Sequence, residues 1–194
     1  MKFVFVAAHG AGSDMNHRSM LQIEQVLRPQ GFEVVRFNFP YRERGSRVPD
    51  RMPALEACFI EKVEEIRPKL DGRRLIIGGR SMGGRVASMM AAAGFACDGL
   101  LLFAYPLHPA GKPDKLRDAH LPQIRVPVLC FNGTRDALCD RLLMERALLN
   151  VQTRWEMHWL EGKDHSFPVT PEIGLTTLKW GQTLFQKPHL PTAT

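Results

Sequence analysis

Three segments of the sequence hold side chains that together could perform nucleophilic catalysis. The first holds Ser81 in the pattern Gly79-x-Ser81-x-Gly83, the second holds Asp136 in NGTRDALC, and the third holds His165 in KDHSF. A serine hydroxyl is a weak nucleophile unless a base takes its proton and an acid orients that base. The types and the chain order of these residues therefore predict acyl transfer through a covalent serine intermediate.

The surroundings of Ser81 support this interpretation. An apolar stretch, Arg73–Gly78, precedes the pattern, and a helix rich in Ala and Met is predicted over Met82–Ala93. A sharp turn between strand and helix projects the serine hydroxyl from the sheet edge and requires small residues on either side. The helix N-terminus adds partial positive charge for a developing oxyanion. The alternative is a glycine-rich turn that serves only tight packing of helix against strand.

The acid and the base also have alternatives in the sequence. Asp140 and Asp164 are fallback acids, although Asp140 is better placed to cap the helix predicted over Asp140–Asn150. Ser166 follows His165 directly, but adjacent side chains in an extended segment diverge. The other histidines end a strand, lie within one, or lie in loops and helices away from the acid (His9, His17, His108, His120, His158 and His189).

A glycine-rich loop after the first predicted strand could complete an oxyanion hole. In this layout one amide comes from that loop and one from the residue after the nucleophile, so we assign the donors to Ala11 and Met82. Gly10 and Gly12 allow close approach of the backbone, and Gly12 is an alternative donor. A dinucleotide-binding turn is the competing interpretation, but the third small residue of that fingerprint would fall at Met15.

These loops connect short apolar runs that alternate with amphipathic segments. Strands are predicted over residues 2–8, 33–39, 73–78, 99–103, 126–131 and 154–160, and helices over residues 15–28, 55–70, 82–93, 140–150 and 172–185. Continuous apolar strands are typical of a parallel sheet covered by helices on both faces. The pattern predicts a three-layer α/β/α fold with about six mainly parallel strands, whose carboxyl ends hold the candidate site.

Length and composition indicate an ordinary globular chain. The 194 residues are 44% hydrophobic and 24% charged, which suits one domain over residues 1–187 with a flexible tail over 188–194. No run reaches the roughly 18 apolar residues of a membrane span. The first residues, MKFVFVAAHG, are predicted to form a core strand rather than a signal peptide.

Charge and cysteine content exclude several partners. The formal net charge is +6, but the one basic cluster (Arg42, Arg44, Arg47 and Arg51) is interrupted by acidic residues. We interpret it as a solvated surface and expect neither nucleic acid nor a membrane as a partner. The four cysteines show no metal-ligand spacing and are expected to be reduced thiols in a cytoplasm, with no metal and no cofactor.

Taken together, the motifs HGAGSDMNH, FNFPYRERG, GGRSMGGRVAS, YPLHPAGKPDKLRDAHLP, NGTRDALC and KDHSF resemble the α/β-hydrolase superfamily. More narrowly they resemble its small dienelactone-hydrolase-like branch, which contains the KANL/Tex-type hydrolase-like proteins. The resemblance implies a hydrolase fold without a lid domain and without the first two strands of larger relatives. It implies hydrolase activity, with Ser81, Asp136 and His165 at the triad positions, but supplies no substrate.

The absence of a lid predicts a shallow pocket between residues 40–53 and 105–122. Candidate substrate-binding residues are Gly10, Gly12, Arg80 and Tyr105, and Arg42 and Arg44 could add charge at the mouth. The expected substrate is a small acyl ester or thioester, with a carboxylate or phosphate as one option; the alternative is that the arginines only tie loops together. A non-catalytic interaction module is the competing function, and a homodimer remains open.

Overall fold

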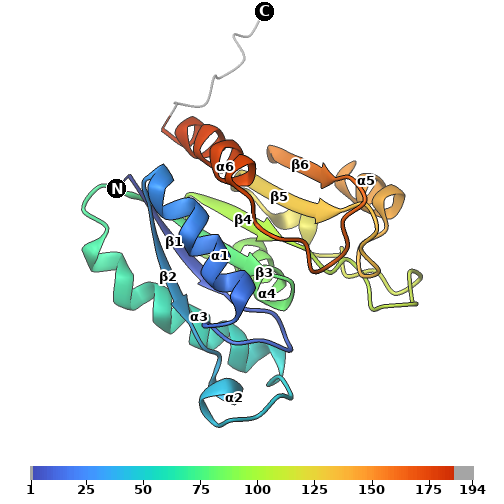
Figure 1. Ribbon diagram of the computed structural model, residues 1–194, viewed down its shortest axis with the longest axis horizontal. Helices are drawn as coiled ribbons and strands as arrows, with labels where there is room; N and C mark the ends of the chain where they lie inside the picture. Colours follow the sequence, from blue (N-terminus) through green and yellow to red (C-terminus); the bar gives the residue numbers. More distant parts are fainter. Residues whose placement is uncertain (1, 186–194) are drawn as a thin grey trace, which may run out of the picture.

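The structure, a computed structural model, describes residues 2–185 and contains one six-stranded sheet in the order β2-β1-β3-β4-β5-β6 (Figure 1). Its strands are β1 (Phe3–Ala8), β2 (Phe32–Phe37), β3 (Arg74–Arg80), β4 (Gly99–Phe103), β5 (Val128–Gly133) and β6 (Trp155–Leu160). All five neighbouring pairs are parallel. The predicted architecture is confirmed, and the sheet is entirely rather than mainly parallel.

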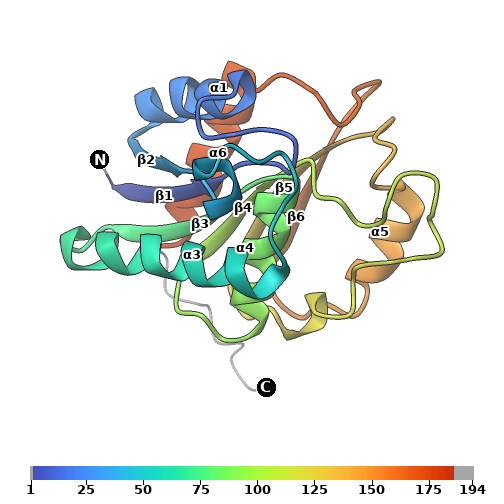
Figure 2. The ribbon, with the colours of Figure 1, turned by 90° about the horizontal axis from the view of Figure 1, so that it is seen from below.

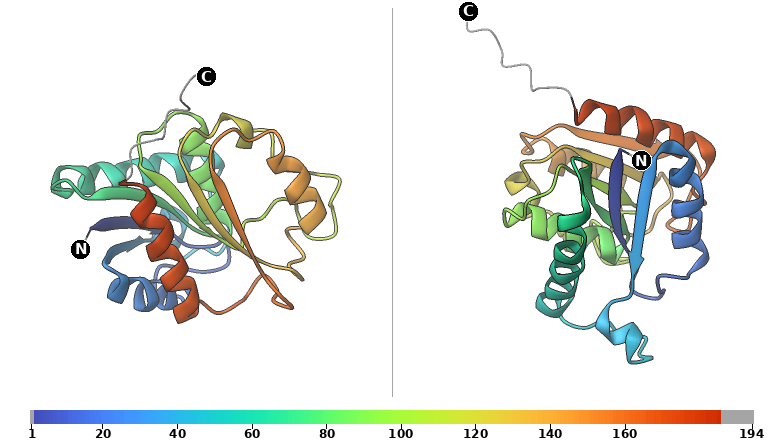
Figure 3. Two further views of the ribbon diagram at one scale, coloured as in Figure 1. Left: turned by 90° about the horizontal axis from the view of Figure 1, so that it is seen from above. Right: turned by 90° about the vertical axis from the view of Figure 1, so that its left-hand side faces the viewer.

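Helices cover both faces of the sheet, as Figure 2 shows. They are α1 (Arg18–Leu27), the short α2 (Pro40–Glu43), α3 (Met52–Ile66), α4 (Met82–Ala92), α5 (Arg141–Leu148) and α6 (Pro171–Thr183). Apolar side chains of α1 and α6 form one buried cluster, and those of α3, α4 and α5 form the other. The right-hand view of Figure 3 shows α1 and α3 on opposite sides of β1 and β2. The molecule therefore has the three predicted layers.

The start of the first helix differs from the prediction. Helix α1 begins at Arg18 rather than at Met15, and its N-cap is His17, whose Nδ1 accepts a hydrogen bond from the Ser19 amide at 3.3 Å. Asp14, the residue before the predicted start of the helix, accepts a hydrogen bond from the Asn16 amide two residues on, at 2.9 Å. Such a local turn satisfies the carboxylate before the helix can start. The tail predicted over 188–194 lies outside the described residues.

Two of the three strands that precede the candidate catalytic loops are longer at their carboxyl ends than predicted. Strand β3 continues through Arg80 and β5 through Gly133, so that each ends within three residues of Ser81 or Asp136. The carboxyl ends of parallel strands meet at one edge of a sheet. Short connections therefore hold the catalytic candidates close to rigid backbone, and no lid domain is inserted among the described elements. No helix within residues 2–185 is both long and apolar enough to span a bilayer.

Candidate active site

Ser81 occupies a strained turn between β3 and α4. Its backbone has φ +51° and ψ −117°, a conformation that a residue other than glycine adopts only when its surroundings enforce it. The neighbouring glycines explain how the turn fits. A Cβ at Gly79 would lie 2.0 Å from the carbonyl oxygen of Ala8, and one at Gly83 would lie 2.3 Å from the same atom. Only glycine allows the turn to pack this closely on β1.

Ser81, His165 and Asp136 form one hydrogen-bonded chain. Oγ of Ser81 lies 2.9 Å from Nε2 of His165, and Nδ1 of His165 lies 2.8 and 3.0 Å from the two carboxylate oxygens of Asp136. A carboxylate only accepts hydrogen bonds, so Nδ1 carries the proton and Nε2 is left to accept one. The three loops predicted to converge are therefore brought together in the order that a serine nucleophile needs.

Asp136 is held from behind by its own loop and by strand β5. Its side chain is fully buried; Oδ1 accepts a hydrogen bond from the Leu138 amide at 2.8 Å, and Oδ2 accepts one from Asn132 Nδ2 at 3.3 Å. The Asn132 side chain also accepts from the amide of Tyr105 at 2.9 Å and donates to its carbonyl at 3.2 Å. Asn132 thereby links the end of β4 to the carboxylate.

The loop that carries His165 is fixed by two contacts to neighbouring strands. A Cβ at Gly133 would lie 2.1 Å from the carbonyl oxygen of Lys163, so β5 and this loop touch backbone to backbone. Arg80 donates from Nη2 to the carbonyls of His165, at 2.7 Å, and Phe167, at 3.0 Å. Its guanidinium also lies 4.7 Å from the Phe167 ring centre. Burial lowers the pKa of Arg80, and the charges of Asp136 and Asp164 oppose that shift.

The candidate oxyanion residues surround the nucleophile. A Cβ at Gly10 would lie 3.4 Å from Ser81 Cβ, whereas Gly12 has open space around it. The Ala11 carbonyl accepts a hydrogen bond from the Tyr41 hydroxyl at 2.9 Å, which anchors the loop. Within residues 2–185 the amides of Ala11 and Met82 donate to no protein group. Unpaired amides beside a nucleophile are what an oxyanion hole requires.

A hollow of about 450 Å³ opens beside Ser81, and we call it the Ser81 hollow. Its lining combines the nucleophile and the oxyanion candidates with apolar side chains and with three charged side chains. The lining residues are Ala11, Asp50, Met52, Leu55, Ser81, Met82, Arg85, Pro106, Pro109, Ala110, Arg117 and Leu138. The loops expected to wall it, residues 40–53 and 105–122, both contribute. This volume is within the range of small-molecule sites.

None of the four predicted substrate-binding residues (Gly10, Gly12, Arg80 and Tyr105) lines the Ser81 hollow, although Ala11 between the two glycines does. Arg80 binds the backbone of the His165 loop, and Tyr105 is fully buried. The two mouth arginines are paired as well: Arg42 Nη2 lies 3.1 Å from Asp14 Oδ2, and Arg44 Nη2 lies 2.6 Å from Asp50 Oδ1. All three arginines therefore tie loops together, which is the alternative that the sequence left open.

A second serine–histidine contact lies deeper in the molecule. Ser88 Oγ is 2.8 Å from His120 Nε2, and the Tyr105 hydroxyl is 3.2 Å from the same nitrogen. Ser88 is fully buried and donates to the Arg85 carbonyl of its own helix at 2.8 Å, and no carboxylate within residues 2–185 hydrogen-bonds to His120. This buried cluster ties the loop after β4 to α4 and lacks the acid and the access that catalysis needs.

The remaining sequence candidates have structural roles. His9 is fully buried, donates from Nδ1 to the Gly10 carbonyl at 2.8 Å and accepts from the Phe39 amide at 3.2 Å. Burial is the main cause of its lowered pKa. Asp140 caps α5 by accepting from the Leu143 amide at 2.9 Å. Within residues 2–185 no group of three His, Cys, Asp or Glu side chains could hold a metal ion.

Sequence reasoning missed four residues that shape the site. Asn132 and Gly133 stand in the NGTRD motif beside Asp136, and a polar residue inside an otherwise apolar strand could have signalled Asn132. Arg85 lies one helical turn after Ser81, a spacing that places it on the same side of α4. Arg117 lies within the segment 105–122 that was predicted to wall the pocket, but this long loop has no periodicity that would single out Arg117 as a lining residue.

Comparison with known families and structures agrees with the fold described above. A family model described as an alpha/beta hydrolase domain matches residues 1–187. Because it covers nearly the whole chain, the match concerns every strand and helix described above, including the three loops that meet at Ser81.

Several solved structures share the fold at low sequence identity. A dienelactone hydrolase from Anabaena variabilis is 19% identical, with a TM-score of 0.69 over 95% of this chain and 85% of that one. A lidless α/β serine hydrolase from Xanthomonas campestris is also 19% identical, with a TM-score of 0.67 over 98% and 84%. Est1E from Butyrivibrio proteoclasticus, solved with ferulic acid, is 15% identical, with a TM-score of 0.74 over 93% and 88%.

Proposed function

The chain belongs to the α/β-hydrolase family, and we propose that it is a serine hydrolase that cleaves small acyl esters or thioesters through an acyl-Ser81 intermediate. The observation that carries the proposal is the hydrogen-bonded chain from Ser81 through His165 to a fully buried Asp136. An interaction module would have no need for a base and an acid aligned on a strained serine from three separate loops.

The chemistry follows from the positions of these groups. His165 Nε2, 2.9 Å from Ser81 Oγ, takes the hydroxyl proton as the oxygen attacks the acyl carbon. The amides of Ala11 and Met82 stabilise the oxyanion that forms. His165 then gives the proton to the departing alcohol or thiol, which leaves an acyl-Ser81 ester. Water, deprotonated by His165, attacks that ester and releases the carboxylic acid together with free Ser81.

Asp136 stabilises the charge that His165 acquires in both steps. Its carboxylate accepts from Nδ1 at 2.8 Å and is itself fixed by Asn132 and Leu138. A buried carboxylate held in this way keeps the imidazole in the tautomer with the proton on Nδ1, so that the unprotonated Nε2 faces the nucleophile. The groups expected to react are thus oriented before a substrate arrives.

Labelling with a fluorophosphonate probe tests the proposal. The wild-type chain is expected to react, and Ser81→Ala is expected to abolish labelling and to lower kcat for 4-nitrophenyl acetate by about 10³- to 10⁶-fold. Ser88→Ala is the matched control, since it removes the hydroxyl of the other serine–histidine contact and should leave labelling intact. Absence of Ser81-dependent labelling and turnover would favour the non-catalytic interaction module instead.

A further inference from the structure

Two arginines of the Ser81 hollow have no acidic partner. Within residues 2–185, neither Arg85 nor Arg117 has an aspartate or glutamate oxygen within 4.0 Å, although ten other arginine or lysine side chains there do. Nε of Arg85 is buried and lacks any hydrogen-bond partner. A half-buried guanidinium that is left unpaired beside a nucleophile is costly unless something else satisfies it.

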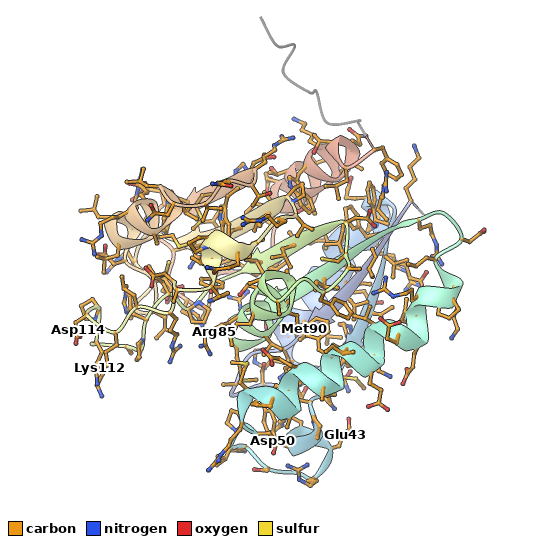
Figure 4. The ribbon with its side chains drawn as sticks, turned by 180° about the vertical axis from the view of Figure 1, so that it is seen from behind. Glu43, Asp50, Arg85, Met90, Lys112 and Asp114 are labelled. Atoms are coloured by element: carbon orange, nitrogen blue, oxygen red, sulfur yellow. The ribbon has the colours of Figure 1, made fainter. Side chains whose placement is uncertain are left out.

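The two arginines reach the same hollow from different elements. Arg85 comes from α4, one turn after Ser81, and Arg117 from the loop between β4 and β5. In Figure 4, Arg85 lies between the segment that holds Asp50 and the loop that holds Lys112 and Asp114. Burial chiefly lowers the pKa of Arg85, and the positive charge of Arg117 lowers it further. An anion between the two guanidinium groups would relieve that repulsion.

The acidic groups near this pair do not neutralise it. Asp50 also lines the hollow; its Oδ1 lies 2.6 Å from Arg44, outside the hollow lining, and its Oδ2 is buried without a hydrogen-bond partner and more than 4.0 Å from both arginines of the pair. Glu56 on α3 acts on Arg85 only at longer range and opposes the lowering of its pKa. The lining therefore keeps two guanidinium groups against one carboxylate that already has a cationic partner.

The wall that carries Arg117 is fixed at several points. The Arg117 amide donates to the Leu107 carbonyl at 2.8 Å, and His120 lies 2.8 Å from Ser88 on α4. His108, in the same segment, accepts from the Asp140 amide at 3.0 Å. These contacts join the loop to α4 and to the start of α5, so that the position of Arg117 relative to Ser81 is set by the fold.

We infer that the Ser81 hollow selects esters whose substrate carries a second, anionic group, a carboxylate or a phosphate, held between Arg85 and Arg117 a few atoms from the scissile carbonyl. This inference rests on the proposed hydrolase function and names its substrate class. Guanidinium groups bind carboxylates and phosphates through paired N–H donors, and such charge-assisted hydrogen bonds are stronger than neutral ones. The apolar side chains Met52, Leu55 and Leu138 would contact the carbon atoms between the anion and the ester.

A comparison of matched esters tests the inference. The kcat/KM of wild-type protein is measured for 4-nitrophenyl hydrogen succinate, for the neutral 4-nitrophenyl butyrate, and for a 4-nitrophenyl ester with a terminal phosphate. We expect at least one anionic ester to be preferred over the neutral one by about 10- to 100-fold, the range for hydrogen bonds to charged groups. The arm with the larger ratio distinguishes a carboxylate from a phosphate substrate.

Variants show whether the two arginines cause the preference. Arg85→Gln and Arg117→Gln should each reduce the anionic-to-neutral ratio about tenfold, and Arg85→Lys should retain part of it. Arg146→Gln is the matched control, because it removes the same charge from an exposed position on α5 and should leave the ratio unchanged. Ser81-dependent probe labelling of each variant shows that the site is still assembled.

The outcomes separate the two proposals. Ester turnover that depends on Ser81 but shows equal rates for neutral and anionic esters would overturn the inference and leave the hydrolase function standing. The inference would also be overturned, with the hydrolase function left standing, if both Arg85→Gln and Arg117→Gln kept the preference for anionic esters. Turnover of none of the esters, together with no Ser81-dependent labelling, would overturn the hydrolase function and the inference with it.

Discussion

At the scale of single residues, the position of Asp136 shows how the acid is chosen among three nearby aspartates. Asp136 is fully buried against His165, whereas Asp140 caps α5 and Asp164 accepts from the Ser166 amide of its own loop at 2.8 Å. A carboxylate that already caps a helix or closes a turn is not free to orient an imidazole. Local hydrogen bonding thus assigns a separate role to each of these aspartates.

Asp136→Asn tests this assignment. The amide nitrogen of Asn132 already donates toward Asp136, so an amide at position 136 would favour the wrong tautomer of His165. We expect kcat to fall by about 10³- to 10⁴-fold with little change in KM. Asp140→Asn, the control, should leave kcat within a few-fold because asparagine is an equally good helix cap. Equal losses in both variants would contradict the assignment.

At the scale of elements, the loop between β4 and β5 depends on a neutral histidine. His120 lies against Ser88 and the Tyr105 hydroxyl, where burial, helped by the positive charge of Arg85, lowers its pKa from 6.5 to about 4. The same loop carries Arg117 and walls the Ser81 hollow. Protonation of His120 should therefore weaken the contact between this loop and α4.

The pH dependence of unfolding tests this role. Between pH 6.5 and pH 4 the unfolded chain binds a proton at His120 that the folded chain does not, so the free energy of unfolding falls as the pH falls. The contribution of neutral His120 to the free energy of unfolding is fully present above pH 6.5. In urea titrations, His120→Gln should flatten the curve in this window by about 1 kcal/mol per pH unit. His9 is present in both proteins and contributes equally to both curves. Parallel curves for the wild-type protein and His120→Gln would therefore show that His120 does not cause the pH dependence.

The elements also show which parts of the site the sequence could predict. The turn at Ser81 and the loops of Asp136 and His165 follow strands with strong apolar patterns, so their shared sheet edge was predictable. Arg117 was not predictable, because the direction of a side chain in a long loop depends on tertiary packing; the spacing of Arg85 from Ser81 indicates its side of α4 but not that it lines the hollow. Local hydrogen bonding at Asp14 likewise shifted the start of α1.

At the scale of the whole molecule, the site rests on a sheet whose central strands are buried on both faces. Every residue of β1, β4 and β5 is buried, and the two apolar clusters lie on opposite faces of the sheet. Alternate residues of β4 belong to opposite clusters: Leu100 and Leu102 to one, Leu101 and Phe103 to the other. A substitution that disrupts packing at the centre of the sheet should therefore destabilise every loop at its edge.

Leu101→Ala tests this dependence. Leu101 is fully buried in the middle of β4, and the cavity left by its truncation should lower the free energy of unfolding by about 2–5 kcal/mol. Leu142→Ala removes the same atoms from a residue of α5 that is 75% exposed and should change it by less than about 0.5 kcal/mol. Circular dichroism during urea titration measures both, and similar costs would contradict the central role of β4.

The placement of the three site residues along the chain has a consequence for synthesis. Ser81, Asp136 and His165 are separated by 55 and 29 positions, and the imidazole comes last, after the sixth strand. A ribosome makes this chain from its amino end, so the hydroxyl and the carboxylate leave the exit tunnel well before their shared partner. A nascent polypeptide that has not yet reached His165 lacks the hydrogen bond to the serine altogether, so reactivity should begin only after the segment that follows the sixth strand has been made.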